Sequence, residues 1–269
     1  MRTCCKASGK QGQHNCAEAK GGPSNNKCGC GKILVVGLGP GNRDLLAPAA
    51  LEALKISDVI IGYKTYLDLI EDLTEGKEVI SSGMRKEIDR AQLAVDLAQQ
   101  GRTVSVISSG DPGVYGMAGI VLELAGDSVD VEVVPGVTAA TAAAAALGAP
   151  LMHDFAVISL SDLLTPWVKI MNRLEAAGLG DFIVVLYNPK SHGRQTHIES
   201  AREILLWHKN PETPVGIVRC AKRGLESVVI TTLRDMLKEE IDMLTTVIVG
   251  NSQTKVENGK MVTPRGYKV

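Results

Sequence analysis

The chain has 269 residues, of which 45% are hydrophobic and 22% charged, and its formal net charge is -1. This composition is typical of a globular protein with a sizeable core, and the near-neutral balance excludes a whole-protein field that recruits nucleic acid. Aromatic residues make up 3%, which argues against a base-stacking surface. No apolar run reaches the roughly 18 to 20 residues of a membrane span, and the N-terminus lacks the apolar core of a signal peptide. We therefore expect a cytoplasmic protein with no nucleic-acid or membrane partner.

The first 31 residues differ from the rest in charge and in cysteine content. Residues 1–32 hold six Lys or Arg and one Glu, a net charge of +5. With almost no apolar residue to bury, this tail is predicted to be disordered unless a metal or an iron–sulfur cluster cross-links it. A plain flexible tail and a redox or storage role stay open, because the cysteine spacing lacks the paired Cys-x2-Cys of zinc modules. The candidate metal ligands are Cys4, Cys5, Cys16, Cys28 and Cys30.

The next stretch predicts a buried strand followed by a ligand-binding loop. Ile33–Val36 is an apolar β-favouring run, and the loop GLGPG at residues 37–41 lets the main chain approach a ligand closely. A similar loop opens dinucleotide-binding folds, but Asn42 stands where the third glycine of that fingerprint belongs. The second strand, 58–61, also lacks an acidic residue at its end. An NAD(P)-dependent oxidoreductase therefore stays an alternative only.

From residue 48 to residue 134 the apolar pattern alternates between helical and strand periods. We predict helices over 48–55, 65–71 and 88–98 and strands over 58–61, 78–81, 103–107 and 129–134. Alternation of this kind is the pattern of a largely parallel α/β sheet.

Strands of this sheet end in loops rich in glycine and proline. GPG closes the first, SSGDPGVYG (108–116) follows the strand at 103–107, and PGVTAAT (135–141) follows the strand at 129–134. In open α/β sheets, ligands bind outside the carboxyl ends of the strands. We expect these loops to line one crevice.

The pattern changes after a helix at 139–147, which stops at Gly148. Residues 151–166 are interpreted as a crossing into a second α/β domain with a terminal hairpin at 255–262. Because the link is short, a ligand cleft between the domains is expected. The predicted division is a tail of 1–31, an N-terminal α/β domain of 32–150 and a C-terminal α/β domain of 151–269. Further elements are predicted as helices 166–177 and 195–207 and as strands 182–187, 215–219, 227–230 and 246–249.

Residues 32–269 resemble the tetrapyrrole methylases, whose two α/β domains bind S-adenosylmethionine between them. Within that family the likeness is to the precorrin-3B or cobalt-factor III C(17)-methyltransferases of cobalamin synthesis. The motifs that carry it are the three loops, YNP at 187–189, GYKTYLDLI at 62–70, GMRKEIDRA at 83–91, residues 134–167, EIDMLTTVIVGNS at 240–252 and MVTPRGY at 261–267.

The resemblance implies a set of site residues, a tetrapyrrole substrate and a homodimer. It places the cofactor, S-adenosylmethionine, on Gly110, Asp111, Gly113, Val114, Tyr115, Thr138, Ala139, Leu186, Tyr187, Asn188, Cys220, Ala221, Thr245 and Thr246. It places the tetrapyrrole on Gly37, Leu38, Gly39, Pro40 and Gly41.

Two further requirements of the implied reaction suggest candidates. The carboxylate arms of a corrin precursor need cations, and Lys64, Arg85 and Lys86 follow strand ends on the binding side. Ring contraction coupled to methylation needs proton transfer, for which His153 and Asp154 are the candidate catalytic pair. A different class, a protein that binds or delivers tetrapyrrole or metal through its Cys tail, stays open.

Overall fold

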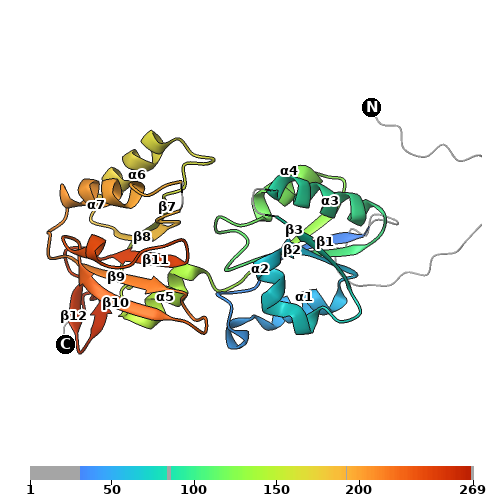
Figure 1. Ribbon diagram of the computed structural model, residues 1–269, viewed down its shortest axis with the longest axis horizontal. Helices are drawn as coiled ribbons and strands as arrows, with labels where there is room; N and C mark the ends of the chain where they lie inside the picture. The colour runs from blue at the N-terminus through green and yellow to red at the C-terminus, as the bar shows by residue number, and fades with distance from the viewer. Residues whose placement is uncertain (1–30, 84–85, 192, 268–269) are drawn as a thin grey trace, which may run out of the picture.

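The structure is a computed structural model that describes residues 31–83, 86–191 and 193–267. Two α/β halves lie side by side, each built on a five-stranded sheet (Figure 1). Within the described ranges, no helix combines the length and the apolar character that crossing a membrane requires.

The N-terminal half contains a wholly parallel sheet in the order β3-β2-β4-β1-β5. The strands β4 and β1 are each buried from the second residue onward, as expected for interior strands covered on both faces. The predicted parallel sheet is therefore confirmed. Its strands are β1 (Lys32–Gly37), β2 (Val59–Tyr63), β3 (Glu78–Ser82), β4 (Thr103–Ser108) and β5 (Asp130–Val134).

Helices cover both faces of this sheet. On one face lie α3 (Glu87–Gln99) and α4 (Ala118–Ala125), and on the other lie α1 (Pro48–Ile56) and α2 (Lys64–Leu67) (Figure 1). The helix predicted over 65–71 is wrong in extent, because α2 gives way to the 3-10 helix η2 (Asp68–Leu73), in which Ile70 has non-helical backbone angles.

The C-terminal half contains a mostly antiparallel sheet in the order β10-β9-β11-β8-β7, in which only β7 and β8 pair in parallel. The strand β7 lies inside the stretch interpreted as a domain crossing. It is an edge strand in which only Ile158 is buried, and its apolar run of four residues, Phe155–Ile158, is bounded by Asp154 and Ser159. The strands are β7 (Phe155–Ser159), β8 (Ile183–Tyr187), β9 (Pro214–Arg219), β10 (Ser227–Thr232) and β11 (Thr245–Val249).

Helices α6 (Trp167–Leu179) and α7 (His197–Leu206) cover one face of the second sheet, and α5 (Ala139–Leu147) covers the other (Figure 1). The buried face of α5 packs its alanines against Ile183, Val185 and Val218. The domain boundary at residue 150 stays a prediction. Because α5 shares its core with the second sheet, we propose that the second domain begins with α5.

Short elements complete the chain. The predicted terminal hairpin is present as β12 (Lys255–Glu257) and β13 (Lys260–Val262), and β13 also pairs in parallel with β6 (Gly148–Ala149). The 3-10 helices η1 (Arg43–Leu45) and η3 (Met236–Lys238) lie after the GPG loop and after β10.

Candidate active site

The three glycine loops at the carboxyl ends of the N-terminal strands touch one another through their main chains. Gly39 donates its N–H to the carbonyl of Gly110 at 3.1 Å, and Gly110 donates to the carbonyl of Gly39 at 2.7 Å. A Cβ on Gly136 would lie 2.2 Å from the carbonyl oxygen of Gly110, and one on Gly37 would lie 2.7 Å from the nitrogen of Gly136. Glycine is therefore needed here for contact between loops as well as for access by a ligand.

Asp111 joins two of these loops. Its Oδ1 accepts the N–H of Gly113 at 2.8 Å, and its Oδ2 accepts the N–H of Gly136 at 3.0 Å. Both carboxylate oxygens thus satisfy main-chain donors, which a shorter or uncharged side chain would leave unpaired. Asp111 orders the floor of the site in addition to lining it.

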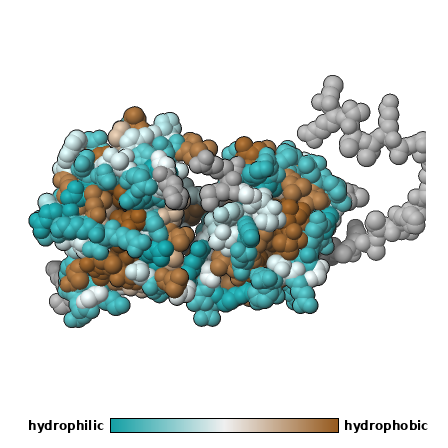
Figure 2. All heavy atoms as spheres, viewed as in Figure 1, coloured by the Kyte–Doolittle hydropathy of each residue, from teal (hydrophilic) through white to brown (hydrophobic). Residues whose placement is uncertain are grey.

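A cavity of about 400 Å³ lies where these loops face the C-terminal half, and Figure 2 shows a hollow between the two halves. This volume falls within the range of small-molecule sites. Its wall combines main chain, hydroxyl groups and apolar side chains. The lining residues are Pro40, Tyr63, Thr65, Tyr66, Ser109, Gly110, Asp111, Val114, Tyr115, Thr138, Ala139, Tyr187, Asn188, Ala221, Arg223, Met243, Leu244, Thr245 and Thr246.

The hydroxyl groups of Tyr187 and Tyr115 form hydrogen bonds between different segments around the cavity. The Tyr187 hydroxyl lies 2.6 Å from Thr138 Oγ1 and accepts the N–H of Ala140 at 2.6 Å. Burial raises the pKa of Tyr187, although its hydrogen bonds to Thr138 and Ala140 act in the opposite direction. Tyr115 crosses to β7, where its hydroxyl donates to the carbonyl of Val157 at 3.0 Å. Both hydroxyl groups therefore fix loop positions.

The backbone is unusual at several cavity residues. Tyr115 and Asn188 line the cavity with positive φ angles of 56° and 50°, and Cys220, next to the lining residue Ala221, has a φ of 51°. Side chains other than glycine rarely adopt this left-handed conformation, and such residues cluster at functional sites. The two lining residues support the assignment of this cavity as the candidate active site.

Most of the predicted cofactor residues come together in the cavity wall. Those that do not line it are Gly113, which donates to Asp111, Leu186, which is fully buried in β8, and Cys220, which precedes the lining residue Ala221. The contact of each residue with a cofactor stays a prediction.

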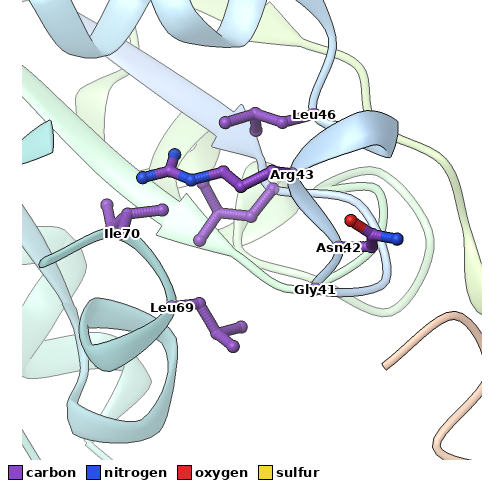
Figure 3. A pocket seen from close by; sticks show the side chains of 7 residues that line it. Gly41, Asn42, Arg43, Leu46, Leu69 and Ile70 are labelled. Carbon is purple, nitrogen blue, oxygen red and sulfur yellow. The ribbon is translucent and has the colours of Figure 1, made fainter. Parts of the chain in front are cut away.

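The predicted tetrapyrrole residues are more scattered. Pro40 lines the cavity, whereas Leu38 and Gly41 face a separate pocket of about 10 Å³ behind the GPG loop. Figure 3 shows this pocket, where the side chain of Arg43 extends toward Ile70. It is too small for any part of a tetrapyrrole, so the loop can meet substrate only through its outer face.

The predicted cations do not line the cavity or lie outside the described residues. Lys64 begins α2 and Lys86 precedes α3, and neither lines the cavity. Arg85 lies outside the described residues, as do the five tail cysteines. In the part of the chain that the structure describes, no three His, Cys, Asp or Glu side chains are grouped to hold a metal ion.

His153 and Asp154 lie on the turn before β7. The distance from His153 Nδ1 to Asp154 Oδ2 is 3.7 Å, and their side chains are 40% and 80% exposed. Neither lines the cavity as the described residues form it. Their catalytic role stays a prediction.

Sequence reasoning missed several residues of the cavity wall. Tyr66 is the most informative, because burial raises the pKa of its hydroxyl within the site. All but Arg223 lie within motifs quoted from the sequence, namely the loop 108–116, GYKTYLDLI and EIDMLTTVIVGNS, but no binding role was given to them there. The missed residues are Tyr63, Thr65, Tyr66, Ser109, Arg223, Met243 and Leu244.

This fold is that of a known family. The sequence profile of the tetrapyrrole (corrin/porphyrin) methylases matches residues 32–237. The chain belongs to the tetrapyrrole methylases.

Two individual relatives give a more specific comparison than the family profile. A cobalt-factor III methyltransferase of Priestia megaterium is 52% identical to this chain. The matched region covers 88% of this chain and 45% of that longer protein. A probable cobalt-factor III C(17)-methyltransferase of Salmonella typhimurium is 51% identical, with 87% of this chain and 99% of that protein covered.

Solved structures agree. The crystal structure of the methyltransferase CobJ superposes with a TM-score of 0.83 at 38% identity, covering 87% of this chain and all of that one. A uroporphyrin-III C-methyltransferase of Thermus thermophilus, complexed with S-adenosyl homocysteine, has a TM-score of 0.64 at 27% identity and covers 82% of this chain and 97% of that one.

Proposed function

We propose that this chain is an S-adenosylmethionine-dependent methyltransferase that methylates carbon 17 of a cobalt-factor III or precorrin-3B type tetrapyrrole. Methylation is coupled to ring contraction and gives a precorrin-4 type product in cobalamin biosynthesis. The names of the relatives support the substrate. The observation that carries the proposal is the cavity between the halves, walled by three glycine loops on one side and by β8, β9 and β11 ends on the other.

The residues present fit S-adenosylmethionine. Apolar side chains such as Val114 and Leu244 suit the adenine ring, and the Thr246 hydroxyl suits a ribose or amino-acid group. When bound, this cofactor supplies an electrophilic methyl group on a sulfonium.

The chain's own contribution is mainly to position the reactants. Methyl transfer needs the donor carbon held in line with an electron-rich ring carbon, and a rigid main-chain floor achieves this without a protein nucleophile. The mutual hydrogen bonds of Gly39 and Gly110 and the carboxylate of Asp111 provide that rigidity. For the proton transfer of ring contraction we keep His153 and Asp154 as candidates.

An anaerobic assay with a labelled methyl donor tests the function. The full chain is incubated with S-adenosylmethionine carrying a 13C methyl group and with either cobalt-factor III or metal-free precorrin-3B. Transfer of the label to carbon 17, located by NMR, is the expected result, and the comparison of the two substrates identifies the metal state. Label found on another ring carbon, or none transferred from either substrate, would reject the proposal.

The cellular location, the oligomeric state and the metal content of the tail are separate proposals. We propose a cytoplasmic homodimer, supported by the family resemblance, and light scattering that finds a stable monomer of about 28.5 kDa would contradict the dimer. We also propose a metal or iron–sulfur site on the tail cysteines, and elemental analysis of anaerobically purified protein tests it. Family membership does not favour the oxidoreductase or delivery-protein alternatives.

A further inference from the structure

The loop after β9 brings an arginine to the cavity that the sequence motifs do not mark. The backbone is left-handed at Cys220 and Lys222, with φ angles of 51° and 55°. The N–H of Lys222 donates to Glu226 Oε2 at 2.6 Å, and the N–H of Arg223 donates to the carbonyl of Cys220 at 2.9 Å. These contacts hold the loop in a conformation that directs Arg223 at the N-terminal half.

Arg223 reaches two loops of the opposite half. Its Nε donates to the carbonyl of Pro40, and its Nη2 donates to Ser109 Oγ at 2.8 Å. A Cβ on Gly41 would lie 2.8 Å from Arg223 Nε, so the glycine at this position makes room for the guanidinium. The side chain therefore spans the cavity at the place where the GPG and GDPG loops meet.

Arg223 brings the positive charge of the cavity wall. Among the described residues that line the cavity it is the only cation, and Asp111, the only anion, accepts main-chain N–H groups. Burial raises the pKa of Tyr66, while the charge of Arg223 acts to lower it, so the positive field extends to that side of the cavity.

The guanidinium also retains donors for a ligand. Nε and Nη2 have protein acceptors, whereas Nη1 has no hydrogen-bond partner in the described part of the chain. A planar guanidinium matches a carboxylate through parallel N–H groups, which a lysine cannot do. The tetrapyrrole of the proposed reaction carries acetate and propionate arms.

We propose that Arg223 binds a carboxylate arm of the tetrapyrrole through its Nη1 and Nη2 groups and thereby holds the substrate against the GPG loop. The hydrogen bond from Nε to the Pro40 carbonyl stays in place and fixes the guanidinium. The Nη2 group exchanges its hydrogen bond to the Ser109 hydroxyl for one to the substrate carboxylate. This inference rests on the proposed function. It adds Arg223 to the predicted substrate cations Lys64, Arg85 and Lys86, of which the described Lys64 and Lys86 are not among the lining residues of the cavity.

Equilibrium binding of cobalt-factor III, followed by its absorbance without turnover, tests the proposal. Arg223→Met removes the charge and the donors, Arg223→Lys keeps only the charge, and Arg234→Met is the matched control. Arg234 is an exposed residue of the same half that pairs with Glu212 at 2.6 Å, and it does not line the cavity. The same ligand with its carboxyl groups methyl-esterified serves as the second probe, and calorimetry with S-adenosyl homocysteine checks the cofactor site.

Arg223→Met is expected to weaken cobalt-factor III binding by about tenfold or more, Arg223→Lys by less, and Arg234→Met by under about twofold. Wild-type protein is expected to prefer the free acid to the ester, and Arg223→Met to lose most of that preference. A purely structural bridge between the halves would leave the preference intact, and that outcome would overturn the proposal.

The failure of the inference is distinguishable from failure of the proposed function. Wild-type protein that binds and methylates cobalt-factor III, with Arg223→Met binding it equally well, refutes the role of Arg223 alone. Wild-type protein that binds neither cobalt-factor III nor S-adenosyl homocysteine refutes the function, and with it this inference.

Discussion

The two halves contribute to the cavity in different ways. The N-terminal half has a parallel sheet whose loops all leave the same edge, and beside side chains such as Tyr66 and Asp111 it supplies glycine loops whose main chains pack against one another. The C-terminal half has a mostly antiparallel sheet and supplies chiefly side chains, such as Tyr187, Arg223 and Thr246. The contacts between glycines leave no room for an added atom, whereas the side-chain contacts depend on particular polar groups. Substitutions should therefore fail for steric reasons at the packed glycines and for polar reasons at the hydrogen-bonding side chains of either half.

The largest effect is expected where the loops touch. Gly136→Ala would place a Cβ 2.2 Å from the carbonyl oxygen of Gly110, so a main chain must move. We expect a loss of roughly 2 to 3 kcal/mol or more in the free energy of unfolding, measured with urea.

The matched control for this prediction is Gly119→Ala. Gly119 lies in α4, where an added Cβ meets nothing within 4 Å, and alanine should stabilise the helix by roughly 0.5 to 1 kcal/mol. Equal urea midpoints for the two variants would mean that the glycine contacts are not rigid.

The next effect concerns the carboxylate that joins two loops. Asp111→Ala leaves the N–H groups of Gly113 and Gly136 without their acceptor. Binding of S-adenosyl homocysteine should weaken by about 1 to 3 kcal/mol, the scale of a lost buried polar partner. Calorimetry that finds wild-type affinity would exclude Asp111 from the cofactor site.

A somewhat smaller effect is expected from the C-terminal half. Tyr187→Phe removes the hydroxyl that bonds Thr138 and Ala140 while it keeps the ring. We expect a loss of about 1 to 2 kcal/mol in unfolding free energy, together with weaker S-adenosyl homocysteine binding. Tyr267→Phe, at a side chain 79% exposed, is the control and should change neither quantity. A Tyr187→Phe variant that matches this control would show that the hydroxyl bonds contribute nothing.

The smallest effect is a pH dependence below neutrality. Burial raises the pKa of Asp242, but hydrogen bonds from Arg219, Thr245 and Leu244 outweigh it and hold this pKa below its ordinary value of 3.8. Because the folded pKa is lowered, the stabilisation is complete above the ordinary value and is lost as the pH falls through the folded one. Asp242→Asn should therefore be less stable than wild type at about pH 7, and the difference should shrink below about pH 4. A difference that is constant across this range in urea unfolding would contradict the assignment.

The sequence predicted the N-terminal half better than the C-terminal half. Buried parallel strands such as β1 and β2 contain continuous apolar runs, so their positions and the loops after them could be identified. The edge strand β7 was not identified, because its short apolar run lies within a longer stretch, 151–166, in which polar residues interrupt the apolar ones. The helix α5 was placed before the domain boundary since its packing partners lie far along the chain, in β9 and β11.

The residues of the site also differ in whether a local sequence signature predicts them. Main-chain ligand loops have a local signature in glycine and proline, and most residues predicted from those loops line the cavity. Arg223 has no such signature, because its approach to Pro40 depends on a contact between residues 183 positions apart. Lys64 and Lys86 were selected for following strand ends, and neither lines the cavity, although Lys64 lies between two residues that do, Tyr63 and Thr65.

Hydrogen exchange of the full chain with and without S-adenosyl homocysteine tests most directly whether both halves form one cofactor site. The account predicts slower exchange in the N-terminal loop 108–116 and, at the same ligand concentration, in the C-terminal segments 186–188 and 243–246. The strands β12 and β13, remote from the cavity lining, should exchange as before. Protection confined to the segments of one half would contradict the account.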